Sequence, residues 1–193
     1  MKNLKQEFHK QISENISVHK TLFSNELEVI KIINLITRSI KKGGKILICG
    51  NGGSSADASH LAAEFLVRLR PNINRMPIAA IPLTIDAPTL TACGNDYGFK
   101  YIFLRNYKAL AGKNDVLLII STSGNSENIL EVLKYAKGKN NIIGFLGNNG
   151  GKAKKYCDNA IVVKSKNVAR IQECHIFLGH FIFQLVEENV IKK

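Results

Sequence analysis

The chain has 193 residues, of which 45% are hydrophobic and 22% are charged, and this composition excludes an intrinsically disordered protein. Its 27 lysines and arginines outnumber its 15 aspartates and glutamates, so the formal net charge is +12. Such a charge attracts anions, including phosphate esters. The lysines are scattered, however, and an ordinary solvated lysine-rich surface is the alternative explanation.

The four cysteines stand far apart and form no C-x-x-C pair, which excludes a zinc knuckle and a thioredoxin-like redox site. One of them, Cys49, lies inside an apolar run and is expected to be a buried, inert thiol. No apolar run approaches the ~18 residues that span a bilayer, and the first residues are polar. We therefore expect a cytoplasmic protein with no membrane partner.

Residues 4–40 show the apolar periodicity of helices, and Gly43-Gly44 ends this region. Five short apolar runs follow, each rich in Ile, Val or Leu and each bounded by Gly, Asn, Asp or Pro. They span residues 45–49, 77–83, 116–120, 141–145 and 160–163. Continuous apolarity predicts strands that are buried on both faces, as in a parallel sheet.

Segments with helical periodicity separate these runs and follow the last of them. They span residues 56–69, about 101–110, 127–137, a short stretch near 152–156, and 169–191. Strands that alternate with helices predict an α/β fold, a doubly wound five-stranded parallel sheet of the flavodoxin-like kind. We expect one domain over residues 1–193, whose leading helices (about residues 1–42) contribute to the core and to oligomer packing.

Two loops rich in glycine and serine follow the first and third predicted strands. The first contains Asn51, Gly52, Gly53 and Ser54, and it precedes a helix. Glycines let backbone amides approach an anion, and the following helix N-terminus favours negative charge. The pattern is neither G-x-G-x-x-G nor a P-loop, so it does not indicate a dinucleotide or triphosphate site. A tight turn with a serine cap is the alternative.

The second loop carries more hydroxyls than a helix cap requires. Ser121, Thr122, Ser123 and Ser126 surround Gly124, and a helix is predicted to begin at about residue 127. Because parallel strands end at one edge of a sheet, which is where such sheets bind ligands, the two loops predict a cradle for one phosphate group.

His60 and Glu64 are four residues apart on the helix after the first loop, so both project from one face. An imidazole and a carboxylate one turn apart either bind a metal or act as an acid–base pair. An ordinary exposed helix pair is the alternative. On the last helix, Gln172 and His180 lie on roughly the same side, and a core histidine is the alternative for His180.

The segments GNGGS, STSGNS and RIQECH resemble the sugar isomerase (SIS) domain family and, within it, the phosphoheptose isomerases. The resemblance covers essentially the whole chain. It implies an aldose–ketose isomerase that converts sedoheptulose 7-phosphate to D-glycero-D-manno-heptose 7-phosphate, the first step toward ADP- or GDP-heptose for lipopolysaccharide or capsule. It also implies a homotetramer with active sites at subunit interfaces, and we expect no nucleic-acid partner.

The resemblance further implies roles for individual residues. His60, Glu64, Gln172 and His180 would bind one Zn²⁺ per subunit, with Glu64 as general base and His180 as general acid. The substrate-binding residues would be Asn51, Gly52, Gly53, Ser54, Asn95, Asp96, Ser121, Thr122, Ser123, Ser126 and Gln172. For Asp96, a cap of the helix beginning nearby is the alternative.

Two other functions remain open from the sequence. One is a non-catalytic SIS protein that binds a replication initiator. The other is a SIS enzyme acting on another sugar phosphate, such as an isomerase of a shorter sugar or an etherase of an amino-sugar phosphate. Neither GNGGS nor STSGNS determines the number of carbon atoms in the substrate.

Overall fold

The computed structural model describes residues 3–84 and 86–191. Its centre is a parallel sheet of five strands in the order β2-β1-β3-β4-β5. The strands are β1 (Ile46–Gly50), β2 (Ala80–Pro82), β3 (Val116–Ser121), β4 (Asn141–Gly147) and β5 (Asn159–Val163). Every residue of β1 and β3 is buried, which explains why these runs are continuously apolar rather than alternating.

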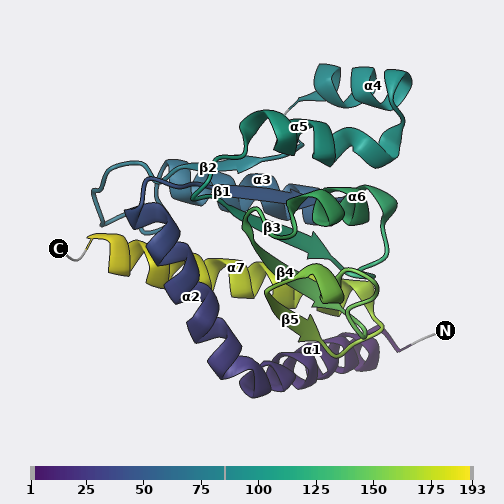
Figure 1. Ribbon diagram of the computed structural model, residues 1–193. Coiled ribbons are helices and arrows are strands. Elements are labelled where there is room, and N and C mark those ends of the chain that lie inside the picture. The colour runs from purple at the N-terminus through teal and green to yellow at the C-terminus, as the bar shows by residue number, and fades with distance from the viewer. Residues whose placement is uncertain (1–2, 85, 192–193) are drawn as a thin grey trace.

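Helices cover both faces of the sheet (Figure 1). The α-helices are α1 (Leu4–Lys20), α2 (Glu26–Lys41), α3 (Gly53–Leu66), α4 (Ala87–Asp96), α5 (Ile102–Leu110), α6 (Glu127–Ala136) and α7 (Val168–Ile191). Three 3-10 turns connect them: η1 (Thr21–Asn25), η2 (Phe99–Tyr101) and η3 (Lys154–Tyr156). No helix within the described residues is long and apolar enough to cross a membrane.

The sheet separates two hydrophobic cores. On one face α2, α3 and α7 pack against alternate strand residues such as Ile48 and Leu118. On the other face α5 and α6 pack against the intervening residues, such as Leu47 and Cys49. Cys49 is fully buried, and burial raises the pKa of its thiol far above the ordinary value, which agrees with the expected inert thiol.

The predicted α/β fold is confirmed, with three local differences. Strand β2 is shorter than the predicted run 77–83, and the predicted short helix near 152–156 is the 3-10 turn η3. Helix α4 was not predicted, because Pro88, Gly94 and two threonines disguise its periodicity. Its start is stabilised locally by Asp86, whose carboxylate accepts a 2.7 Å hydrogen bond from the Thr89 backbone N–H.

Candidate functional site

Strands β1 and β3 are neighbours in register, so the loops that follow them lie side by side at the carboxyl edge of the sheet. Strand β2 lies on one side of β1 and β3 lies on the other, so the direction in which strands are added reverses at β1. This is the point of an α/β sheet at which ligands bind. The two loops predicted to hold phosphate therefore lie together at the edge of the sheet where such folds bind ligands.

The first loop turns sharply into α3. Gly52 precedes the helix with a φ of 55°, a conformation that favours glycine. Ser54 is buried in the first turn of the helix. The Asn51 side chain exchanges two hydrogen bonds of 2.9 and 2.8 Å with the side chain of Asn128 on α6. This amide pair ties the first loop to the start of the second loop's helix.

The second loop is ordered by its own hydroxyls. Ser121 Oγ accepts a 3.0 Å hydrogen bond from the Gly124 N–H, and Ser123 Oγ accepts a 3.2 Å bond from the Asn125 N–H. The hydroxyls of Thr122 and Ser126 make no hydrogen bond with any part of the chain that the structure describes. They are available to a ligand.

Both loops end at helix N-termini, whose first backbone N–H groups lack partners within the helix. Ser126 occupies the N-cap of α6 but makes no side-chain capping bond, and Gly52 provides no cap to α3. Two uncapped N-termini at one edge of the sheet favour an anion in front of them.

Beyond the first turns of α3, three metal-binding side chains converge. His60 Nε2 lies 2.8 Å from His180 Nε2 and 3.4 Å from Glu64 Oε1. One donor atom from each of the three residues lies within 4.8 Å of the others. His60 and Glu64 come from α3 and His180 from α7 of the same chain, so this group forms without a second subunit.

Burial and charge both act on His180, which is partly buried. Burial and the positive charge of His60 lower its pKa, whereas Glu64 opposes the change. His180 is therefore held neutral, the form that binds metals. Because its ring faces His60 rather than the hydrophobic core, the core-histidine alternative is wrong.

The donor set suits zinc. Zn–N and Zn–O bonds of about 2.0–2.1 Å place tetrahedral ligand atoms about 3.3 Å apart. The His60–Glu64 separation of 3.4 Å matches this spacing, and the His60–His180 separation of 2.8 Å needs only a small opening. The His60 side chain is 48% exposed, which leaves the group open on one side to a substrate.

Asp57 is a neighbour of this group that sequence reasoning missed. It stands one turn before His60 on α3, and one of its carboxylate oxygens is buried without a hydrogen-bond partner among the described residues. Burial raises the pKa of Asp57, and the charge of His60 opposes the rise. The three-residue spacing from His60 was the available signal.

Gln172 and His175 occupy different sides of α7. The Gln172 amide packs against Gly53 at the start of α3, close to the phosphate loops, where any larger residue than glycine would collide with it. Its place as a fourth metal ligand stays a prediction. His175, in contrast, is fully buried and faces Phe145 of β4.

Among the described residues, Asn95 and Asp96 make no hydrogen bond with either loop. They form the exposed end of α4, which packs on α5 and η2 (Figure 1), and their side chains bond to each other at 2.9 Å. The capping alternative for Asp96 is wrong, because the residue ends α4 rather than beginning a helix. Their predicted contact with substrate remains a prediction.

Comparisons with known proteins identify the family of the chain. The SIS domain family model matches residues 7–147. The chain is 45% identical over 182 residues to the phosphoheptose isomerase of Campylobacter concisus, covering 92% of this chain and 95% of that protein. It is 46% identical over 167 residues to the phosphoheptose isomerase of Aquifex aeolicus, covering 86% of each.

A solved structure supports the same relationship. The phosphoheptose isomerase of Neisseria gonorrhoeae superposes with a TM-score of 0.89 at 36% identity, covering 96% of this chain and 100% of that one. These full-length matches to enzymes set aside the non-catalytic alternative. The chain belongs to the SIS domain family, within it to the phosphoheptose isomerases, and is an isomerase.

Proposed function

We propose that this isomerase interconverts sedoheptulose 7-phosphate and D-glycero-D-manno-heptose 7-phosphate. The observation that carries the proposal is the convergence of His60, Glu64 and His180 beside two uncapped helix N-termini. The names of the relatives support the seven-carbon substrate. The product would serve, in the cytoplasm, the synthesis of nucleotide-linked heptose for lipopolysaccharide or capsule.

The substrate phosphate would bind between the two loops. The hydroxyls of Ser54, Thr122 and Ser126 would donate to it, together with backbone N–H groups at Gly52 and Gly53. Ser121 and Ser123 already accept bonds from loop amides, so their O–H groups are free to donate to the phosphate. The surplus of positive charge on the chain favours the approach of such an anion.

The isomerisation moves a proton between C1 and C2 of the sugar through an enediolate. Glu64 would take the carbon-bound proton, because a carboxylate is an effective base once it is held against its substrate. His180 would supply a proton to the oxygen, for which it must first take up a proton, since the folded protein favours its neutral form. The two groups come from different helices, and because their ligand atoms lie within 4.8 Å of each other, both could reach one pair of reacting carbons.

His60, Glu64, Gln172 and His180 would hold one Zn²⁺ per subunit. When bound, the ion would polarise the substrate carbonyl and stabilise negative charge on its oxygen. Glu64 serves in two roles in this proposal, as ligand and as base. Because a tightly bound carboxylate is a weak base, its hold on the ion would loosen during turnover.

The sugar hydroxyls would be bound by Gln172, Asn51, Asn95 and Asp96. Gln172 is the best supported of these, because it packs on the first residue of α3 beside the phosphate loops. The side chain of Asn51 is already paired with Asn128, so its role would include shaping the loop. Asn95 and Asp96 would reach a substrate from the end of α4.

We also propose that the chain forms a homotetramer with sites near subunit interfaces. Helix α1 carries an exposed apolar stripe, repeating every four residues, made of Leu4, Phe8, Ile12 and Ile16. Beside it, an apolar groove of about 760 Å³ runs between the leading helices and α7 and is lined in part by Phe23, Phe177 and Phe181. Adjoining apolar surfaces of this kind mark interfaces between chains.

The decisive test is proton NMR of the anomeric region during incubation with sedoheptulose 7-phosphate. We expect the wild-type protein to convert the substrate and Glu64→Gln to lose about 10²- to 10⁴-fold in kcat. Glu131→Gln is the matched control and should retain full activity, because Glu131 is 27% exposed and, among the described residues, pairs only with Lys134 one turn along α6.

Two outcomes would contradict parts of the proposal. Near-normal turnover by Glu64→Gln would exclude it as the base. Conversion that survives complete metal removal by a chelator would exclude the zinc site while leaving the isomerase. Failure of the metal-loaded wild type on this substrate, with activity on a shorter sugar phosphate, would replace the substrate and keep the reaction.

A further inference from the structure

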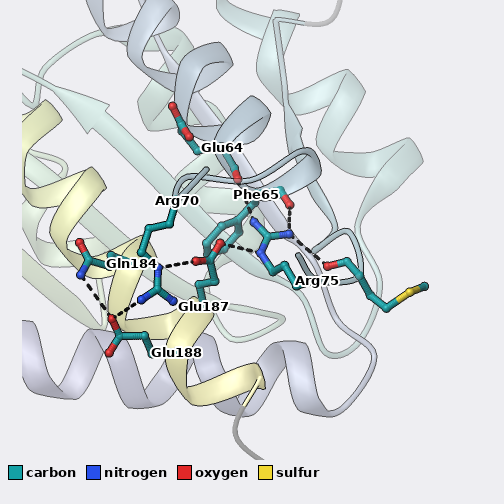
Figure 2. A network of polar contacts seen from close by, with 8 residues as sticks. Glu64, Phe65, Arg70, Arg75, Gln184, Glu187 and Glu188 are labelled. Carbon is teal, nitrogen blue, oxygen red and sulfur yellow. Dashed lines mark hydrogen bonds and ion pairs between the residues drawn. The ribbon is translucent and has the colours of Figure 1, made fainter. Parts of the chain in front are cut away.

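Arg75 binds the end of α3 although it lies outside any helix or strand, in the segment between α3 and β2. The Arg75 side chain is only 3% exposed. Its guanidinium donates hydrogen bonds to the backbone carbonyls of Glu64 at 2.9 Å, Phe65 at 2.9 Å and Met76 at 3.1 Å. Its Nε donates to Glu187 Oε2 at 2.6 Å. Figure 2 shows this guanidinium between the end of α3 and helix α7.

These bonds fix the backbone at Glu64 itself. The last carbonyls of a helix have no partners within it, and a positive charge there is favourable. Arg75 satisfies the Glu64 and Phe65 carbonyls just before α3 ends at Leu66. In Figure 2 the Glu64 carboxylate points away from Arg75, toward the other side of the helix. The arginine therefore holds the residue in place without touching its reactive group.

Glu187 connects this helix end to α7. It is fully buried, and its two carboxylate oxygens accept bonds from Arg75 at 2.6 Å and Arg70 at 2.9 Å. Burial would raise the pKa of Glu187, but the hydrogen bonds and charges of the two arginines bring it below its usual range. Buried ion pairs stabilise a fold little more than apolar packing does, so stability alone does not account for this one.

The same face of α7 carries His180. Glu187 follows His180 by seven residues, which is about two turns, or about 10 Å, along one face of the helix. Between them Phe183 stacks on Phe65 with ring centroids 3.9 Å apart. The α3–α7 interface therefore holds His180 against His60 and Glu64 at one level and the Arg75–Glu187 pair at the next.

We propose that Arg75 and Glu187 are positioning residues that set the distance between Glu64 on α3 and His180 on α7. The inference rests on the proposed function, in which those two side chains act on one substrate and one metal ion. A helix end that is free to shift by about 1 Å would misplace Glu64, and misplacement of that size costs up to about 100-fold in rate.

Three variants and one control test the pair. Arg75→Lys keeps the charge but cannot make four bonds at once, and Glu187→Gln removes the charge but keeps the shape. The double variant Arg75→Leu/Glu187→Leu replaces the ion pair by apolar packing and leaves neither charge of the pair buried alone, so it costs less stability than removing one partner. Glu188→Gln is the matched control, because Glu188 binds Arg70 at 2.8 Å, is 29% exposed, and makes no hydrogen bond to α3 among the described residues.

The measurements are zinc affinity by competition with a chromophoric chelator, Tm by circular dichroism, and kcat and KM separately. We expect zinc affinity to fall about 10- to 100-fold in all three variants, as for other residues that hold a metal ligand in place. We expect kcat to fall more than KM rises, and the double variant to keep a higher Tm than Glu187→Gln, which leaves the Arg75 charge buried without its partner. Glu188→Gln should match the wild type throughout.

Each alternative result is distinguishable. Wild-type zinc affinity and kcat in the double variant would overturn the positioning role and leave the proposed function intact. Losses that merely follow Tm across the variants would reduce the pair to a structural role and also overturn it. A wild-type protein that neither binds zinc nor isomerises the substrate would overturn the proposed function and this inference together. If Arg75→Lys does not fold, Glu187→Gln and the double variant decide.

Discussion

His175 lies on α7 between Gln172 and His180, yet its ring is completely buried against Phe145 of β4. Neither ring nitrogen makes a hydrogen bond of normal geometry with the described residues. Burial lowers the pKa of His175 to about 4, and the Leu146 backbone opposes this change. An imidazole in such a place is neutral in the folded protein and binds a proton more readily in the unfolded chain.

This residue predicts acid sensitivity. Stability from neutral His175 is fully present above pH 6.5, the pKa of the unfolded chain, and is lost as the pH falls from 6.5 toward 4. The loss is about 3 kcal/mol of unfolding free energy. The free energy of unfolding, measured with urea, should differ less between pH 5 and pH 7.5 in His175→Leu than in the wild type. His9→Gln, at an exposed histidine of α1, should leave the difference unchanged; an unchanged difference in His175→Leu would contradict the assignment.

At the scale of elements, the phosphate loop after β3 depends on one glycine. Gly124 has a φ of 62°, and a Cβ at this position would collide with the backbone of Gly150 in the loop after β4. Both features require glycine, because left-handed backbone is strained for other residues and the opposing atoms are backbone, which does not move easily. The loops after β3 and β4 therefore fit together only in the absence of a side chain.

Gly124→Ala is predicted to weaken the loop more than an equivalent change elsewhere. Gly138→Ala is the matched control: its φ is 79°, but nothing lies within 4 Å of the added Cβ. We expect the control to lose about 1–2 kcal/mol of stability from backbone strain alone. Gly124→Ala should lose more and should also raise KM for the sugar phosphate. Equal losses of stability, with KM unchanged, would show that the fit to Gly150 is unimportant.

For the whole molecule, the leading helices have more apolar surface than the chain itself covers. Helix α1 buries only Val18, whereas Leu4 is 81% and Phe8 64% exposed. The side of α1 next to this stripe is anchored to the last helix by polar contacts, such as Asn15 with Glu173 at 2.7 Å. These contacts leave the stripe exposed to solvent, and its apolar side chains favour burial against another copy of the chain.

This arrangement predicts that charges on the stripe dissociate the assembly. Ile12→Asp/Ile16→Asp should convert a tetramer to smaller species, because two carboxylates cannot be buried in an apolar interface without a large cost. Light scattering coupled to size-exclusion chromatography measures the mass. Lys10→Asp, on the opposite side of α1, should leave the tetramer intact. A wild-type monomer, or an unchanged mass in the double variant, would contradict the assembly.

The sequence by itself determined the features that depend on neighbours along the chain. The apolar runs predicted the strands because a strand buried on both faces must be apolar throughout. The spacing of His60 and Glu64 placed both on one side of α3, since the period of a helix is a local property. The loop composition around Gly52 and Gly124 likewise predicted tight turns before two helices. Resemblance to a known family then supplied the partners on the last helix.

Only the tertiary structure decided which distant residues meet. It brings His180 to 2.8 Å from His60 because α7 packs closely on α3, where Gly179 leaves room for Leu61 and no larger residue fits. It shows that His175, five residues earlier, turns inward instead. Asp57 offered only its three-residue spacing from His60 and Arg75 offered no sequence pattern, because the importance of both lies in burial within the folded chain. Such contacts are set by packing between elements far apart in the chain, which local periodicity does not encode.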